Sequence, residues 1–122
     1  MKIQVQQQSM RVRVDEDELA QLLAEVALVN RTRLALDATW SLQLGLHDDE
    51  MAAFTPTPAM LQLWLPRRDV FALQARLPSR DGLVFEIDNE GGTIEVRFDV
   101  DVRDSVRRRD WSKVSAAAVS SH

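Results

Sequence analysis

Apolar and polar residues alternate along most of this chain, a pattern that predicts β-strands. Successive side chains of a strand point to opposite faces of a sheet, so a period of two indicates one buried and one solvated face. The apolar rows are Ile3 and Val5; Met10, Val12 and Val14; Leu34 and Leu36; Leu42, Leu44 and Leu46; Leu61, Leu63 and Leu65; Leu83, Phe85 and Ile87; and Ile94, Val96, Phe98, Val100 and Val102. Such alternation favours antiparallel sheets, because buried parallel strands are apolar throughout.

Two segments follow the helical period instead. The first begins at Asp15, which has Glu18 three residues later, close to the spacing of a capping box. Its apolar stripe comprises Leu19, Leu22, Leu23 and Val26. The second helix is predicted from Pro66, which suits the first helical position, to Pro78, which ends it. Its apolar face comprises Val70, Leu73 and Leu77, with Phe71 and Ala75 beside them.

The order of these elements indicates the fold class. Residues 2–47 are predicted as strand, strand, helix, strand, strand, and residues 51–103 repeat that order with a weak first strand. We expect one α+β domain over residues 1–103, with a twisted, mainly antiparallel sheet of seven to eight strands and two short helices on one face. A sheet of that width curls or splits. A barrel-like sheet and two ββαββ halves are both compatible with the pattern.

Composition places the chain among ordinary globular domains of the cytoplasm. The chain has 122 residues and no cysteine, which excludes a disulfide framework, a thiolate metal site and cysteine catalysis. Residues 1–6 lack the apolar run of a secretory signal, and no stretch is apolar enough for a membrane span. We therefore predict a cytoplasmic protein.

The charge is distributed unevenly. The net charge is −4, yet residues 1–102 carry ten basic and seventeen acidic residues, whereas residues 103–122 carry five and two. Residues 104–122 are predicted to form a basic, flexible C-terminal tail that pairs loosely with the acidic body. The alternative is an anchor for nucleic acid or anionic lipid, but the acidic balance gives no reason to expect nucleic acid.

Motifs of catalysis and metal binding are missing from the sequence. There is no glycine-rich phosphate loop, Gly-x-Ser-x-Gly elbow or His-Glu-x-x-His helix. His47 precedes the acidic run Asp48-Asp49-Glu50, which could ligate a divalent cation. A metal site normally gathers ligands from several elements, so a solvated turn is the favoured interpretation. We predict no catalytic residue, metal or cofactor.

The polar face of the predicted sheet is the better candidate for chemistry. Its candidate ligand-binding residues are Arg11, Arg13, Glu86, Arg97 and Asp99. The arginines could bind phosphate or carboxylate, and the carboxylates could hold magnesium. The alternative is a solvated surface with weak cross-strand ion pairs.

Met60 and Trp64 are candidate interface residues. They are an even number of positions apart, so we expect both side chains on one face of the strand. The leucines that predict the core point to the opposite face. An exposed tryptophan and methionine on a sheet face can mark a protein interface. The alternative is that neighbouring elements cover both faces of this strand.

The chain resembles a family of small uncharacterised bacterial proteins. The resemblance rests on Met1-Lys2-Ile3, on Ser9-Met10-Arg11-Val12-Arg13-Val14 before an acidic helix start, and on Leu61-x-Leu63-x-Leu65-Pro66 entering a helix. It covers most of residues 1–103. Family members carry an acidic, cysteine-containing last strand and an Asn-Pro tail, whereas residues 96–103 here alternate and a basic tail follows. The resemblance implies a compact fold and a bacterial source, and no site residue.

Three functions remain open at this point. The first is a non-enzymatic binding or protein-interaction module, self-associating as a homodimer because alternating strands need their edges paired or protected. The second is binding, with or without hydrolysis, of a small phosphorylated or anionic ligand on the Arg/Glu/Asp face. The third is nucleic-acid binding through the basic tail, which predicts salt-dependent affinity.

Overall fold

The computed structural model describes residues 1–79 and 81–102, which form eight strands and two helices. In chain order the elements are β1 (Lys2–Gln6), β2 (Ser9–Asp15), α1 (Glu16–Leu23), β3 (Leu28–Ala35), β4 (Ala38–His47), β5 (Ala53–Pro56), β6 (Leu61–Pro66), α2 (Arg67–Ala75), β7 (Leu83–Asn89) and β8 (Gly92–Asp101). This order confirms the two predicted ββαββ units. The predicted basic tail, residues 104–122, lies outside the described residues.

The strands form two four-stranded sheets, so the prediction of one sheet of seven to eight strands was wrong, and the described strands do not close into a barrel. Sheet A has the order β1-β2-β8-β7, and sheet B has the order β3-β4-β6-β5. In each sheet two antiparallel hairpins join through a central parallel pair, β2–β8 or β4–β6. Helices of eight and nine residues are too short to cover eight strands, so the apolar faces of the two sheets cover each other.

Each ββαββ unit contributes one of its two hairpins to sheet A and the other to sheet B. The first unit gives β1–β2 to sheet A and β3–β4 to sheet B, and the second gives β5–β6 to sheet B and β7–β8 to sheet A. Each helix carries the chain from one sheet to the other. The units are therefore equivalent in topology, with β3 and β7 in corresponding edge positions, and neither unit forms a complete sheet by itself.

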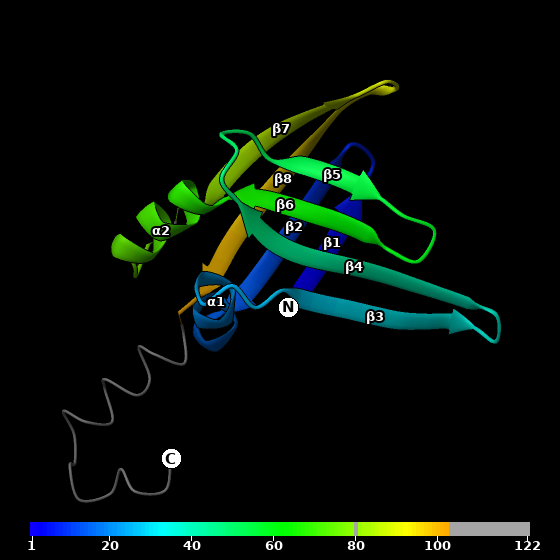
Figure 1. Ribbon diagram of the computed structural model, residues 1–122, viewed down its shortest axis with the longest axis horizontal. Coiled ribbons are helices and arrows are strands. Elements are labelled where there is room, and N and C mark those ends of the chain that lie inside the picture. The colour runs from blue at the N-terminus through cyan, green and yellow to red at the C-terminus, as the bar shows by residue number, and fades with distance from the viewer. Residues whose placement is uncertain (80, 103–122) are drawn as a thin grey trace, which may run out of the picture.

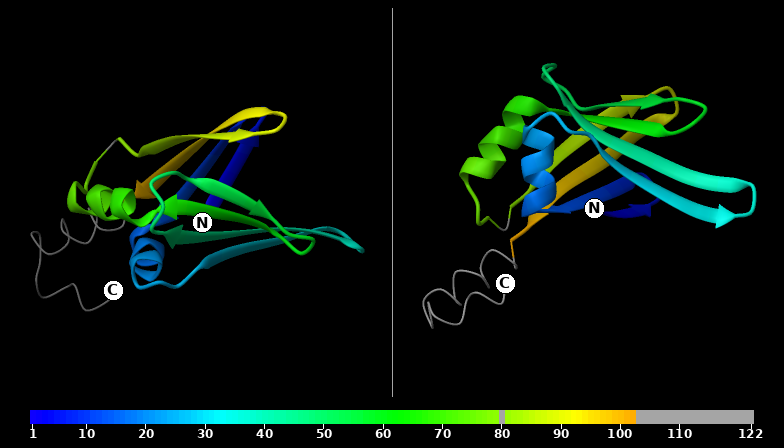
Figure 2. Two further views of the ribbon diagram at one scale, coloured as in Figure 1. Left: turned by 45° about the horizontal axis from the view of Figure 1, so that its top comes forward. Right: turned by 60° about the horizontal axis from the view of Figure 1, so that its bottom comes forward.

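Both helices lie at one end of the molecule, and the sheets diverge from them toward the hairpin turns (Figures 1 and 2). Helix α1 contacts β2 and β8 of sheet A and β3 and β4 of sheet B. Helix α2 contacts β6, β7 and α1. The helices therefore fill the narrow end between the sheets, rather than lying on one face of a single sheet as predicted. Neither of them is long and apolar enough to cross a bilayer.

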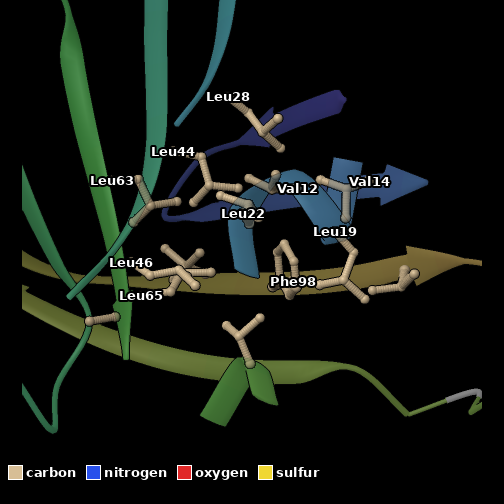
Figure 3. Close-up of a cluster of buried hydrophobic side chains, with 14 of the residues drawn as sticks. Val12, Val14, Leu19, Leu22, Leu28, Leu44, Leu46, Leu63, Leu65 and Phe98 are labelled. Atoms are coloured by element: carbon tan, nitrogen blue, oxygen red, sulfur yellow. The ribbon is translucent and has the colours of Figure 1, made fainter. Parts of the chain in front are cut away.

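The core lies where α1 enters between the sheets (Figure 3). Leu19 and Leu22 of α1 are 3% and 1% exposed. Around them pack Val12, Val14 and Phe98 of sheet A and Leu28, Leu44, Leu46, Leu63 and Leu65 of sheet B. The predicted apolar rows of β2, β4, β6 and β8 thus form the interior, and their polar partners form the outer faces of the two sheets.

The predicted capping box at α1 is confirmed. Asp15 is the N-cap residue, its carboxylate accepts a hydrogen bond from Glu18 N at 2.7 Å, and Glu18 Oε1 accepts one from Asp15 N at 3.0 Å. Glu18 also binds the amino group of Met1 at 2.5 Å, which ties the start of β1 to the helix. The helix ends at Leu23, and Val26 is 50% exposed, so its assignment to the apolar stripe was wrong. Glu25, with φ of 68°, turns the chain away before that position.

Helix α2 differs slightly from its prediction. Pro66, the expected first helical residue, is instead the N-cap and the last residue of β6, and the helix begins one position later at Arg67. Val70 and Leu73 are buried as predicted, whereas Phe71 is 45% exposed because it lies on the outer side of the helix. The helix ends at Ala75, before Pro78.

Strand β3 is longer and more exposed than predicted. It begins at Leu28, and only that residue of the strand is buried. Leu34 is 69% exposed and Leu36, in the following turn, is 85% exposed. The alternation predicted these leucines to face the core, but the β3–β4 hairpin extends past the end of the sheet that it would pack against (Figure 2).

Candidate functional site

The five candidate ligand-binding residues all lie on the outer face of sheet A. They alternate with buried Val12, Phe98 and Ile87 on their strands, which fixes their direction. In the register of the parallel β2–β8 pair, Arg11 lies beside Arg97 and Arg13 lies beside Asp99. Glu86 of β7 lies opposite Glu95 of β8. The predicted polar face therefore exists as one continuous surface.

Three of the five residues converge on a cavity. Arg11 Nε donates to Asp99 Oδ2 at 2.5 Å, across a chain separation of 88 residues. Arg11, Arg13 and Asp99 line a hollow of about 480 Å³ beside the segment that follows α2, where Ser79, Asp81 and Gly82 contribute. Leu73 and Leu77 of the α2 region form its apolar wall.

A second, smaller cavity adjoins the first and shares its arginines. It has a volume of about 140 Å³ and is lined by Lys2, Gln4, Arg11 and Arg13. Lys2 lies directly opposite Arg13, and Gln4 lies opposite Arg11, in the β1–β2 hairpin. Three cationic side chains and one amide thus face one small space without an acidic residue in its lining. We call these four residues the basic pocket.

Arg13 has an unusual environment within the basic pocket. Its side chain is half-buried, and its Nε atom is buried without a hydrogen-bond partner among the described residues. Leaving a buried donor unpaired costs about 1–3 kcal/mol, and more when the group is charged. Native proteins pair nearly all such groups. Arg13 also lines the basic pocket, where its guanidinium group favours an occupant with negatively charged oxygens.

Gly82 packs closely against the carboxylate of Asp99, which binds Arg11. A methyl group at this glycine would overlap the carbonyl oxygen of Phe98 and Oδ1 of Asp99. Only a residue without a side chain allows the segment after α2 to pack this closely against β8. Gly82 thereby closes one side of the larger cavity.

The structure does not bring Glu86 and Arg97 into either cavity. Arg97 Nε donates to Glu95 Oε1 at 2.8 Å, and this hydrogen bond raises the pKa of Arg97 above its ordinary value. Glu86 is exposed on β7, the edge strand beyond β8.

The sequence analysis did not identify Lys2 and Gln4 as residues of the candidate site. The signal for them is the hairpin register: a two-residue turn at residues 7–8 places Lys2 opposite Arg13 on the same face.

Met60 and Trp64 lie on the outer face of sheet B, and both are half-buried. The Trp64 ring stacks with His47 at a centroid distance of 6.3 Å and an interplanar angle of 15°. It also covers Gly45, where an added Cβ would lie 2.8 Å from Trp64 Cζ3. Trp64 therefore contacts its own sheet closely, which reduces the apolar area that it offers to a partner.

The acidic segment after His47 makes local contacts. His47 Nε2 lies 2.7 Å from the Met51 carbonyl oxygen, and Asp48 forms an ion pair with Arg67. Glu50 lies 3.9 Å from Arg68. Within residues 1–79 and 81–102, no group of three or more histidine and acidic side chains is arranged to hold a metal ion.

Arg67 joins three segments at the helical end. Besides Asp48, it binds both carboxylate oxygens of Glu25 at 2.7 Å, from the loop between α1 and β3. These hydrogen bonds lower the pKa of Glu25 below the ordinary glutamate value. The side chain of Arg67 is 25% exposed and that of Glu25 is 57% exposed, so solvent screens the pair.

Comparison with known proteins assigns no function. No family model and no curated protein matches the sequence. The resemblance to small bacterial proteins stays a prediction.

Proposed function

We propose that this protein is a non-enzymatic binding module that recognises an anionic oxygen-bearing group, a phosphate or a carboxylate, in the basic pocket. The observation that carries the proposal is the position of Arg13. Its half-buried side chain lines a space together with Lys2, Gln4 and Arg11, and its buried Nε has no hydrogen-bond partner among the described residues. Guanidinium groups bind phosphate and carboxylate through parallel hydrogen bonds, and the lysine adds a third positive charge.

The size of the basic pocket supports a single anionic group. A water molecule occupies about 30 Å³ in the liquid, so a space of about 140 Å³ accommodates one phosphate or carboxylate with little room to spare. The larger cavity beside it has room for the remainder of a small ligand.

Binding is favoured over catalysis by the same side chains. The side chains of Lys2, Arg11 and Arg13 offer hydrogen-bond donors and no acceptor, and Gln4 is neither a nucleophile nor a base. General acid–base chemistry needs a group that titrates near the working pH. Hydrolysis of a bound phosphoester would therefore need a group outside this lining.

Phosphate titration followed by NMR tests the proposal. Inorganic phosphate is added to the full chain, and to the Arg13→Gln and Arg31→Gln variants. Arg31→Gln removes the same charge from the outer face of sheet B, outside the pocket. Hydrogen bonds to charged groups contribute about 1.5–3 kcal/mol, so Arg13→Gln should weaken phosphate binding by about tenfold to a hundredfold. Arg31→Gln should leave binding nearly unchanged. Equal affinity in the two variants, or no saturable binding by the wild type, would contradict the proposal.

The proposal also includes two predictions from the sequence: that the protein associates with itself and that it is cytoplasmic. Self-association is supported by the exposed edge strands of both sheets, since an uncovered edge is a ready site for another strand. A cytoplasmic location is supported by the absence of cysteine.

A further inference from the structure

Strand β3 is an edge strand with an exposed distal half. It pairs with β4 on one side only, and its residues 31–35 are all exposed. Leu34 is 69% exposed and Leu36 is 85% exposed, on the hairpin that extends past sheet A. An open edge with unpaired backbone groups and exposed leucines is a site for pairing with a further strand.

The charges on β3 oppose pairing with another β3. Arg31 and Arg33 point to the outer face, opposite Ser41 and Thr39, and no described acidic side chain forms an ion pair with them. A two-fold antiparallel pairing centred on residues 31–33 places arginine opposite arginine. Like charges directly opposite each other destabilise a strand pair. The edge therefore favours a strand with acids at the same two-residue spacing.

Strand β7 carries acids at that spacing on another free edge. It is the edge strand of sheet A, and Glu86 and Asp88 are exposed on its outer face. Glu86 lies opposite Glu95, whose carboxylate is bound by Arg97, so Glu86 has no cationic partner among the described residues. Asp88 accepts a hydrogen bond from Thr93 Oγ1 at 2.8 Å. This edge likewise opposes pairing with its own copy.

We propose that β3 of one molecule pairs antiparallel with β7 of a second molecule of this chain. Placing Arg33 opposite Glu86 also brings Arg31 opposite Asp88, because both pairs of residues have the same spacing. Leu34 follows Arg33 at a shift in the β3–β4 register, and in the new pairing it comes next to Phe85, which is half-buried at the edge of sheet A. The contact thus adds backbone hydrogen bonds, neutralises charges and covers an exposed leucine in a single register.

The arrangement of the two edges makes this association head to tail. β3 and β7 lie on opposite sides of the molecule (Figure 1), and they occupy equivalent positions in the two ββαββ units. One contact uses β3 of the first copy and β7 of the second, and it leaves a free edge of the other kind at each end. A heterologous contact of this type continues into a chain of copies or closes as a ring. The average mass should therefore rise with protein concentration.

Charge reversal with rescue tests the pairing. Sedimentation velocity is measured on the full chain over a range of concentrations, with Arg33→Glu, Glu86→Arg, their double variant, and Arg76→Glu as the control. Arg76 is the exposed C-cap residue of α2 and lies outside both edges. Each single edge variant should raise the dissociation constant at least tenfold, and Arg76→Glu should not. The double variant should associate again, and so should an equimolar mixture of the two single variants.

The outcomes separate this inference from the proposed function. A wild type that stays monomeric, single variants that associate like the wild type, or a double variant that stays apart would overturn the pairing. Urea unfolding midpoints close to the wild-type value confirm that the variants fold. Phosphate binding by Arg33→Glu should be unchanged, since Arg33 is on sheet B and outside the basic pocket. Loss of association with retained phosphate binding thus supports both conclusions independently.

Discussion

The position of α1 between the sheets gives the sharpest stability prediction. Leu22 is 1% exposed, packed among side chains of both sheets, whereas Leu36 is 85% exposed in the β3–β4 turn. Leu22→Ala and Leu36→Ala remove the same three carbon atoms. Burying those atoms contributes about 0.8 kcal/mol each, or about 2.4 kcal/mol, and a cavity left behind raises the cost toward 5 kcal/mol.

The cost of Leu22→Ala should lie in the upper part of that range. The neighbours of Leu22 belong to hydrogen-bonded strands on two sides, which limits collapse into the cavity. We expect Leu22→Ala to lower the free energy of unfolding by about 3–4 kcal/mol. Leu36→Ala should change it by less than about 0.5 kcal/mol.

Urea unfolding followed by circular dichroism measures both values. The slope of the transition should be the same in the two variants, because the surface exposed on unfolding hardly changes. A domain of this size has a total stability of about 5–15 kcal/mol, so Leu22→Ala remains folded enough to measure. A cost below about 1 kcal/mol for Leu22→Ala, or equal costs for the two variants, would refute the placement of α1 between the sheets.

Three further predictions concern single contacts. Gly82→Ala should lower the free energy of unfolding by about 1–3 kcal/mol, because its methyl group collides with β8, and urea unfolding measures this; an unchanged midpoint would contradict the close packing. Asp15→Ala should cost about 1 kcal/mol by removing the N-cap, whereas Asp17→Ala should not, and equal urea midpoints would count against the capping box. The Glu25–Arg67 pair stabilises the fold above the unfolded-state pKa of Glu25 and is lost as pH falls through the lowered folded-state pKa. Glu25→Gln should therefore flatten the fall of the urea midpoint in acid, and an identical pH profile would exclude this contribution.

Local structure could be predicted from the sequence more completely than the pairing of strands. Alternation correctly placed Val12 and Phe98 inside and Arg11 outside, because the side-chain direction depends only on position along a strand. It could not show which strands are neighbours. Alternation in β2 and β8 indicated antiparallel pairing, yet these strands are parallel, and their arginines are tolerated because the outer face of sheet A is solvated.

The candidate site was predicted in part for the same reason. The alternation of side chains along the strands placed Arg11, Arg13 and Asp99 on the polar face of the predicted sheet. The structure brings these three residues together around the larger cavity. Lys2 was missed because its contribution depends on the register of the β1–β2 hairpin rather than on its own strand. Arg97 shares the face but is held by Glu95, a contact between residues of one strand that alternation alone does not reveal.

The exchange of hairpins between sheets has a consequence for synthesis on the ribosome. Sheet B is complete once β6 has emerged, whereas sheet A lacks its central partner until β8, the last described strand, leaves the exit tunnel. Until then the edge of β2 that pairs with β8 stays without its partner strand, although α1 and sheet B are already present. Arg11 likewise receives Asp99 from that last strand. A nascent chain that stalls before residue 99 carries all four residues of the basic pocket but lacks the carboxylate that binds Arg11, so the complete site requires that β8 has emerged.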